Sequence, residues 1–162
     1  MRKRKILSSL LLGIAVVGGV AFSARINKIA NLETEKYKKM SDKHLALFLL
    51  MNQWVKVKQD GKKLSSFLEE KGYKKIAIYG MSYVGETLLN ELREGTIQTV
   101  YVIDKQADGI YTDLKVVSPE EYLEEVDAII VTPITFFEDI KRMLETRVGC
   151  PIISIEDILF KM

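Results

Sequence analysis

The sequence predicts an α/β fold: a mostly parallel, five-stranded sheet with helices on both faces, preceded by an N-terminal transmembrane helix and a helical stalk. Three observations lead to this prediction. A long uncharged run follows a basic N-terminus. From Lys74 onward, short β-branched runs alternate with amphipathic helical patterns, which is typical of βαβ units. The first of these runs ends in a loop, Gly80–Gly85, that leads directly into a helix.

Composition and charge narrow the classes of partner. The 162 residues, 48% of them hydrophobic, suffice for one domain with appendages. Residues 1–75 hold 17 basic and 6 acidic side chains, whereas residues 76–162 hold 7 basic and 16 acidic ones. An acidic C-terminal domain is a poor binder of a phosphate backbone, so we expect no nucleic acid partner. We expect the basic half to contact a lipid bilayer and its anionic headgroups. The single Cys150 excludes an intramolecular disulfide and predicts no metal cluster.

The first 24 residues predict a membrane anchor. The basic N-terminus (1–5) precedes 19 uncharged residues (6–24), which would span roughly 29 Å as a helix, close to the hydrocarbon thickness of a bilayer. We therefore expect a single-pass protein of the cell membrane. The alternative is a cleaved signal peptide, with Ala21-Phe22-Ser23 as the cleavage site. Basic residues flank both ends of the run, and nucleotide ligands occur mainly in the cytosol, so we expect the C-terminal domain on the cytoplasmic side.

Two helical segments separate the anchor from the sheet. Residues 25–43 are polar and contain no proline or glycine, which predicts a helical stalk. The segment 44–72 begins with a helix over 44–59, in which nearly every residue from Leu45 to Val55 is apolar. Such a helix must pack against its own domain, a second copy in a homodimer, or a membrane partner. A short connecting helix over 62–71 follows.

Residues 73–162 contain the predicted sheet. Strands are expected over residues 76–79, 100–104, 114–118, 128–132 and 151–155. Helices are expected over residues 84–94, 119–126 and 135–147, with a final helical turn over 156–160. The spacing of apolar residues predicts that the inward side chains are Val84, Leu88, Leu89 and Leu92, and later Phe136, Ile140 and Leu144. The wholly apolar run 128–132 is typical of a buried parallel strand.

The loop after the first strand carries the main functional signal. Its residues, Gly80-Met81-Ser82-Tyr83-Val84-Gly85, match G-x-G-x-x-G except that Ser82 replaces the middle glycine. In that fingerprint a pyrophosphate lies at the helix N-terminus. The match makes Gly80, Met81, Ser82, Tyr83 and Gly85 candidate binding residues, and a tight turn with no ligand is the alternative. Glu86 stands where a P-loop has its lysine, which argues against phosphoryl transfer.

Polar residues at two further strand ends extend this candidate site. Asp104 ends the second strand, 19 residues after Gly85, a spacing that suits a carboxylate bonded to a ribose or sugar hydroxyl. Asp104 could equally form a turn, and the adjacent Lys105 is a further binding candidate. An acid here favours NAD or a nucleotide sugar over NADP.

Thr132 and Thr135 follow the buried strand at its carboxyl end, where open α/β sheets bind ligands. Thr135 is also expected to cap the helix that follows. No histidine, cysteine or lysine meets a catalytic partner at this edge, so we find no catalytic constellation and expect a protein that is not an enzyme.

Residues 73–160 resemble the small Rossmann-like domain of bacterial capsule and surface-polysaccharide biosynthesis proteins. They are similar to the nucleotide-sugar-binding N-terminal domain of bacterial sugar acetyltransferases. The resemblance is carried by KKIAIYGMSYVGE, VIDK, VDAIIVT and CPIISIEDIL. It implies a nucleotide or nucleotide-sugar binding module, accessory to membrane-bound glycan assembly. The β-helix that performs acetyl transfer in those enzymes has no counterpart in these residues, so acetyl transfer is not expected. The alternative is a membrane-tethered structural adaptor with a vestigial pocket, acting through the helix over 45–55.

Overall fold

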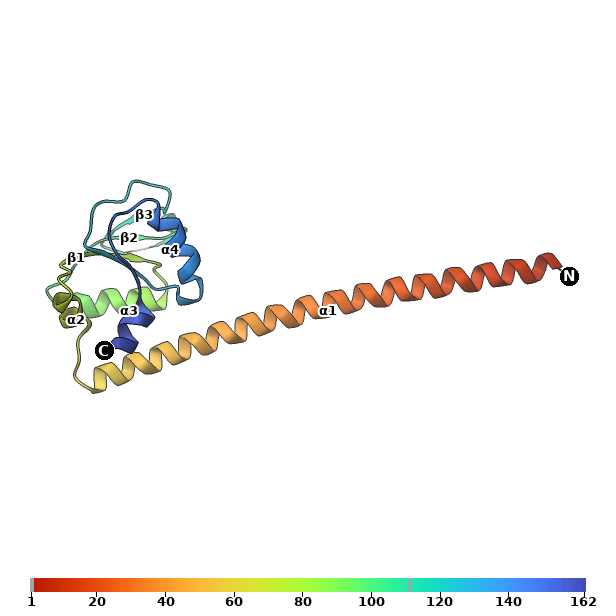
Figure 1. Ribbon diagram of the computed structural model, residues 1–162, viewed down its shortest axis with the longest axis horizontal. Coiled ribbons are helices and arrows are strands. Elements are labelled where there is room, and N and C mark those ends of the chain that lie inside the picture. Colours follow the sequence, from red (N-terminus) through yellow and green to blue (C-terminus); the bar gives the residue numbers. More distant parts are fainter. Residues whose placement is uncertain (1, 111) are drawn as a thin grey trace. The chain divides into compact units, whose positions relative to one another are not determined.

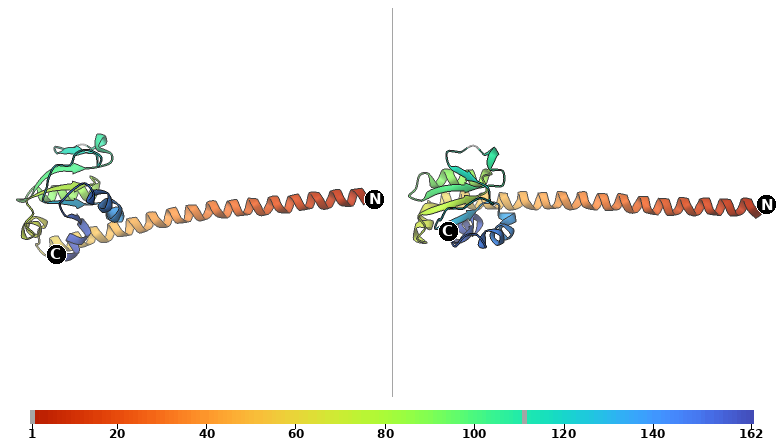
Figure 2. Two further views of the ribbon diagram at one scale, coloured as in Figure 1. Left: turned by 45° about the horizontal axis from the view of Figure 1, so that its top comes forward. Right: turned by 90° about the horizontal axis from the view of Figure 1, so that it is seen from above.

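The computed structural model describes residues 2–110 and 112–162, and their side chains from residue 25 onward apart from residue 108. The chain divides into two compact units, Met1–Leu45 and Ala46–Met162. Helix α1 (Arg2–Gln59) provides the first unit and the beginning of the second. In the first unit, every described side chain is exposed, and α1 is uninterrupted there (Figure 2). Residues 25–43 are therefore helical, as predicted.

The predicted membrane anchor, residues 6–24, lies outside the side chains that the structure describes. Over the described part of the chain, no helix is both long enough and apolar enough to cross a membrane.

The second unit contains a five-stranded sheet in the order β3-β2-β1-β4-β5 (Figure 1). All its strand pairs are parallel. The strands are β1 (Lys75–Tyr79), β2 (Gln98–Ile103), β3 (Lys115–Val117), β4 (Ala128–Val131) and β5 (Ile152–Ser154). The predicted α/β class with five strands is confirmed. Tyr79 is in register with Ile103 on one side and Val131 on the other, so β1, β2 and β4 end at the same level.

Four more helices and two 3₁₀ turns complete the unit. They are α2 (Leu64–Glu70), α3 (Tyr83–Leu92), η1 (Ala107–Gly109), η2 (Ile134–Phe136), α4 (Phe137–Glu145) and α5 (Ile155–Lys161). These strands and helices begin and end within two residues of the predicted bounds, with one exception. The helix expected over 44–59 is not separate, because it continues α1 without a break.

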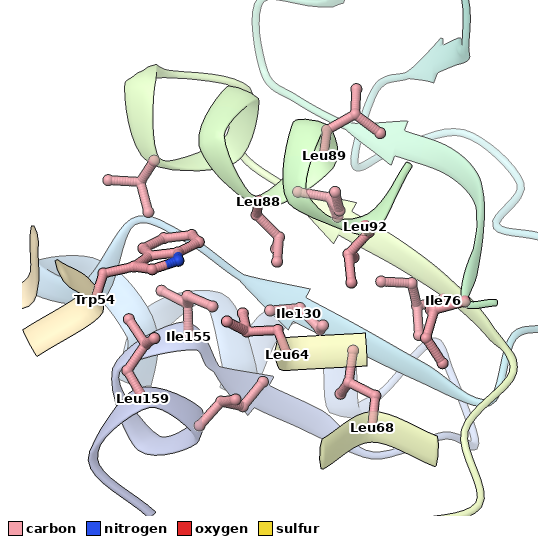
Figure 3. Close-up of a cluster of buried hydrophobic side chains, with 14 of the residues drawn as sticks. Trp54, Leu64, Leu68, Ile76, Leu88, Leu89, Leu92, Ile130, Ile155 and Leu159 are labelled. Atoms are coloured by element: carbon pink, nitrogen blue, oxygen red, sulfur yellow. The ribbon is translucent and has the colours of Figure 1, made fainter. Parts of the chain in front are cut away.

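Helices cover both faces of the sheet because alternate strand residues point to opposite sides. Ile76 and Ile78 of β1 pack on one face with side chains from α2, α3, α5 and the end of α1. Figure 3 shows this cluster, in which Trp54 lies among residues of the other helices. Ala77 and Tyr79 pack on the opposite face with α4. The four residues expected to face inward on α3 are all buried.

One carboxylate connects the last turns of α1 to α2 and α3. Glu91 of α3 accepts a hydrogen bond from Trp54 Nε1 at 2.6 Å. Its other oxygen accepts from Lys58 Nζ at 3.1 Å and from the backbone N–H of Leu64 at 3.2 Å. This last bond satisfies one of the free N–H groups at the start of α2, where Lys63 provides no side-chain cap. Glu91 therefore joins α1, α2 and α3.

The helix predicted over 119–126 is wrong, since this segment contains turns and irregular chain but no helix. Its glutamates explain the difference. Helical geometry would place Glu120 beside Glu124, and Glu121 beside Glu125, as like-charge pairs four residues apart. Such pairs are destabilising, and they oppose the helix that Pro119 would otherwise begin well.

The segment gains its hydrogen bonds from neighbouring side chains instead. The Arg147 guanidinium donates to the carbonyls of Glu120 and Glu121 at 3.1 and 2.8 Å. The Tyr101 hydroxyl donates to the carbonyl of Glu124 at 2.8 Å. The segment thus connects β3 to β4 as non-helical chain.

Candidate functional site

A cavity of about 360 Å³ opens at the carboxyl ends of β1, β2 and β4. After β1 the chain adds β2 and β3 on one side of the sheet, and β4 and β5 lie on the other. The gap between the loops after β1 and β4 is thus a topological switch point, where open parallel sheets bind their ligands. We call it the switch-point cavity, and its lining residues are Tyr79, Gly80, Asp104, Lys105, Pro133, Phe136, Asp139, Ile140 and Met143.

The two glycines of the loop are required by the packing of the chain on itself. Gly80 has a φ of +91°, and a Cβ there would lie 2.7 Å from the Pro133 side chain. A Cβ on Gly85 would lie 2.1 Å from the carbonyl oxygen of Gly80. The alternative interpretation of the glycine pattern, a tight strand-to-helix turn, therefore accounts for both residues, and Gly80 also lines the cavity.

The other loop candidates lie apart from the cavity. Ser82 is the N-cap residue of α3, but its side chain makes no capping hydrogen bond. Tyr83 is 87% exposed. Met81 lines a separate cavity of about 500 Å³ beside α3. The structure thus brings Gly80, and not the whole predicted loop, together with the other lining residues.

Asp104 connects the loop after β1 to the loop after β2. One carboxylate oxygen accepts the backbone N–H of Met81, and the other accepts that of Gln106, both at 2.9 Å. The turn-forming role is therefore present. The carboxylate also lines the cavity next to Lys105, so both residues predicted at this strand end lie at the site.

The two threonines differ in their roles. Thr132 is 1% exposed, and its hydroxyl donates to the carbonyls of Tyr79 and Gly80 at 3.1 and 2.8 Å. It holds the loops after β1 and β4 together and does not line the cavity. The predicted capping role of Thr135 is wrong: the chain after Pro133 forms a 3₁₀ turn, which moves the N-cap of α4 to Phe136.

Tyr79, the last residue of β1, lies at the site although no sequence pattern predicted it there. Its side chain is 3% exposed and lines the cavity. Among the side chains that the structure describes, its hydroxyl is the one buried polar group with no hydrogen-bond partner. Burial, together with the nearby carboxylates of Asp104 and Glu120, raises the pKa of Tyr79. The sequence contains one signal for this residue, which is a tyrosine at the end of a strand whose other buried side chains are alkyl groups.

The beginning of α4 supplies the other unpredicted side of the site. Phe136 was expected to point inward, but it lies in η2, is 53% exposed and lines the cavity. Asp139 also lines it and forms an ion pair with Arg142. Pro133, Ile140 and Met143 add carbon surface. The site therefore combines an apolar wall from α4 with polar groups from the ends of β1 and β2.

The fold and this cavity define a small, doubly wound α/β protein with a ligand-sized site at its switch point. The chain belongs to the family described as C2185-like, N-terminal, which matches residues 72–155. The matched range contains all five strands and every residue that lines the switch-point cavity. No curated protein and no solved structure matches the chain.

Proposed function

We propose that this chain is a membrane-anchored, Rossmann-like module that binds a nucleotide or a nucleotide sugar in the switch-point cavity and has no catalytic role of its own. The observation that carries the proposal is the position of the cavity, at the carboxyl ends of β1, β2 and β4. Ligands of open parallel sheets bind at this place. The strand order β3-β2-β1-β4-β5, which is the order of the Rossmann type, supports the proposal.

The size and lining of the cavity favour part of a nucleotide-type ligand. Its volume of about 360 Å³ is near the lower end of the 300–1,000 Å³ usual for small-molecule sites. Such a volume suits one unit of the ligand better than a whole dinucleotide. Ser82, in place of the middle glycine of the dinucleotide fingerprint, favours a nucleotide sugar over NAD. An apolar wall with a few polar groups is also the usual composition of such sites.

The cellular role that we propose is an accessory or regulatory one in envelope polysaccharide synthesis. It rests on the resemblance of residues 73–160 to the domains of polysaccharide biosynthesis proteins. The uncharged run 6–24 after a basic N-terminus supports attachment to the cell membrane, where such synthesis takes place.

Calorimetry on the full chain in detergent tests the binding function. We expect a UDP-sugar to bind, and NAD and coenzyme A to bind more weakly or not at all. Lys105→Ala, at the exposed rim of the cavity, should weaken binding of the UDP-sugar, because an ammonium group there attracts phosphate. Lys56→Ala, on α1, is the matched control and should bind as the unchanged chain does. If none of these ligands binds at millimolar concentration, the proposed function is wrong.

Asp104 is a poorer choice for this test. Its carboxylate holds the backbone N–H groups of Met81 and Gln106, so Asp104→Ala would disturb the cavity wall whether or not a ligand uses it.

Membrane fractionation tests the anchor. The full chain should remain with membranes after alkaline extraction, and a chain that lacks residues 2–24 should be released. Retention of the shortened chain would contradict an anchor in this segment.

A second candidate function is that of a membrane-tethered structural adaptor with a vestigial pocket. The apolar side chains that α1 exposes favour this function. Within the second unit, α1 buries Leu50 and Trp54, yet Phe48 is 67% and Val55 is 52% exposed. An adaptor would bind its partner, or a second copy, through these side chains. Phe48→Ser with Val55→Ser should then abolish association measured by sedimentation. Unchanged sedimentation of the double variant would contradict the adaptor function.

A further inference from the structure

We propose that the Tyr79 hydroxyl selects the ligand of the switch-point cavity by donating a hydrogen bond to an uncharged oxygen of its nucleoside or sugar unit, while the phosphates stay outside the cavity. This inference rests on the proposed function and goes further, because it names the part of the ligand that enters and the residue that selects it.

Tyr79 has an unusual hydrogen-bonding state. Its hydroxyl is buried and, among the described residues, has no partner. A buried polar group without a partner is destabilising, and native structures rarely retain one without a reason. Its near neighbour Tyr101, which pairs with Ala77 on the adjacent strand, shows the ordinary arrangement, since that hydroxyl donates to a backbone carbonyl at 2.8 Å. Tyr79 thus retains a donor for which the described residues supply no acceptor.

The Tyr79 hydroxyl also remains a hydrogen-bond donor. Burial and the carboxylates of Asp104 and Glu120 raise the pKa of Tyr79, so the hydroxyl keeps its proton at neutral pH. A protonated phenol that lacks a partner requires an oxygen or nitrogen acceptor.

The expected acceptor is uncharged. The carboxylates of Asp104 and Glu120 lie close enough to contribute to the raised pKa of Tyr79, and both would repel a phosphate placed beside its hydroxyl. A carbonyl of a base, or a hydroxyl or ring oxygen of a sugar, would accept the bond without this repulsion.

The other residues that line the cavity form an apolar wall and a basic rim. Pro133, Ile140 and Met143 provide a carbon surface suited to the face of a ring. Asp139 is already paired with Arg142. Lys105 is the one basic residue among those that line the cavity, and it is exposed. A phosphate is therefore attracted to the rim rather than to the interior.

Tyr79 lines the cavity, but its hydroxyl has negligible exposed area. A ligand in the cavity therefore reaches the hydroxyl by displacing a neighbouring side chain. Removal of the hydroxyl should then weaken ligand binding without destabilising the protein.

Calorimetry on the full chain with four probes tests the inference: uridine, UMP, a UDP-sugar and inorganic pyrophosphate. We expect uridine to bind within about tenfold of UMP, and pyrophosphate not to compete with either. Tyr79→Phe should weaken uridine, UMP and the UDP-sugar by a similar factor, about 10-fold or more, as expected for one lost hydrogen bond. Lys105→Ala should weaken binding of UMP and the UDP-sugar and leave binding of uridine unchanged. Tyr37→Phe, on a tyrosine of α1 that is 64% exposed, is the matched control and should change nothing.

Thermal denaturation separates a binding role of Tyr79 from a structural one. Tyr79→Phe should melt at the same temperature as the unchanged chain or higher, since it removes an unsatisfied group. If probes bind but Tyr79→Phe binds them equally well, or if pyrophosphate competes with uridine, the inference is wrong and the proposed function stands. If Tyr79→Phe melts at a clearly lower temperature, the hydroxyl has a structural partner and the inference is wrong. If no probe binds the unchanged chain, the proposed function and this inference are both wrong.

Discussion

Tyr101 and Tyr79 place the same side chain in two different hydrogen-bonding environments on one face of the sheet. Both are almost fully buried, at 2% and 3% exposure. The Tyr101 hydroxyl supports the chain between β3 and β4 through the carbonyl of Glu124, whereas the Tyr79 hydroxyl has no partner within the described residues. The Tyr101 hydroxyl therefore serves the fold, and the Tyr79 hydroxyl is the one that we propose to bind a ligand.

Replacing Tyr101 should produce the stability change that replacing Tyr79 does not. Tyr101→Phe should lower the free energy of unfolding by about 1 kcal/mol or somewhat more, because it leaves the Glu124 carbonyl without its donor. Urea denaturation at pH 7 measures this. Equal midpoints for Tyr101→Phe and the unchanged chain would contradict it.

Tyr101 also makes the stability sensitive to alkaline pH. Burial, chiefly, raises the pKa of Tyr101 to about 12, against about 10 in an unfolded chain. The neutral phenol therefore stabilises the fold fully below pH 10, and this contribution is lost as the pH rises from 10 through 12. Urea midpoints measured over this range should fall less steeply for Tyr101→Phe than for the unchanged chain. Parallel curves would show that Tyr101 is not responsible.

Gly85 should tolerate no side chain. Gly85→Ala places a Cβ against the backbone carbonyl of Gly80, and neither can move without shifting the loop, so we expect a loss of about 1–3 kcal/mol of unfolding free energy. Gly149→Ala is the matched control, because nothing lies within 4 Å of its added Cβ. Similar urea midpoints for the two variants would contradict the close packing of the loop.

At the scale of elements, the strands and helices could be predicted where local spacing determines them. Short, wholly apolar runs predicted β1 and β4, and the 3.6-residue spacing of Leu88 and Leu92 predicted the inward face of α3. The segment 119–126 has helical spacing too, but its glutamates repel one another, and side chains distant in sequence satisfy its backbone. Spacing alone does not include those contacts.

The site was predictable to the same extent. Asp104 and Lys105 follow a strand end and were found by position, since carboxyl ends of parallel strands meet at one edge. Phe136 and Asp139 reach the cavity only because α4 begins two residues later than expected, after a 3₁₀ turn. Whether the Tyr79 hydroxyl has a hydrogen-bond partner depends on the residues that surround it in the fold. The sequence pattern of one strand gives no information about those residues.

Glu91, which connects α1 to α3, gives a prediction at the scale of elements. Trp54 fluorescence measures it directly. Trp54 is the one tryptophan of the chain and is 3% exposed. All three donors around Glu91 are N–H groups, so the amide nitrogen of Glu91→Gln would oppose at least one of them. We expect a loss of about 1–3 kcal/mol and a red-shifted Trp54 emission. Glu94→Gln, at an exposed position beyond the end of α3, is the control. Unshifted Trp54 emission in Glu91→Gln would contradict the connection of α1 to α3 through Glu91.

At the scale of the whole molecule, the hydrophobic core extends beyond the range that the family match covers. The match begins at residue 72, but Leu50, Trp54 and Val57 of α1 belong to the cluster that covers one face of the sheet. The first unit contributes no described buried side chain. The core therefore requires the last turns of α1 and does not require residues 25–45.

Truncation should reveal this boundary. A chain of residues 46–162 should unfold cooperatively, with the same urea midpoint as a chain of residues 25–162, because the residues removed between them are exposed. A chain of residues 61–162 loses three large buried side chains, each worth about 2–5 kcal/mol. Their sum approaches or exceeds the 5–15 kcal/mol by which domains are usually stable. Circular dichroism should therefore show weakened or absent cooperative unfolding. A chain of residues 61–162 as stable as that of 46–162 would mean that α1 rests on the domain without stabilising it.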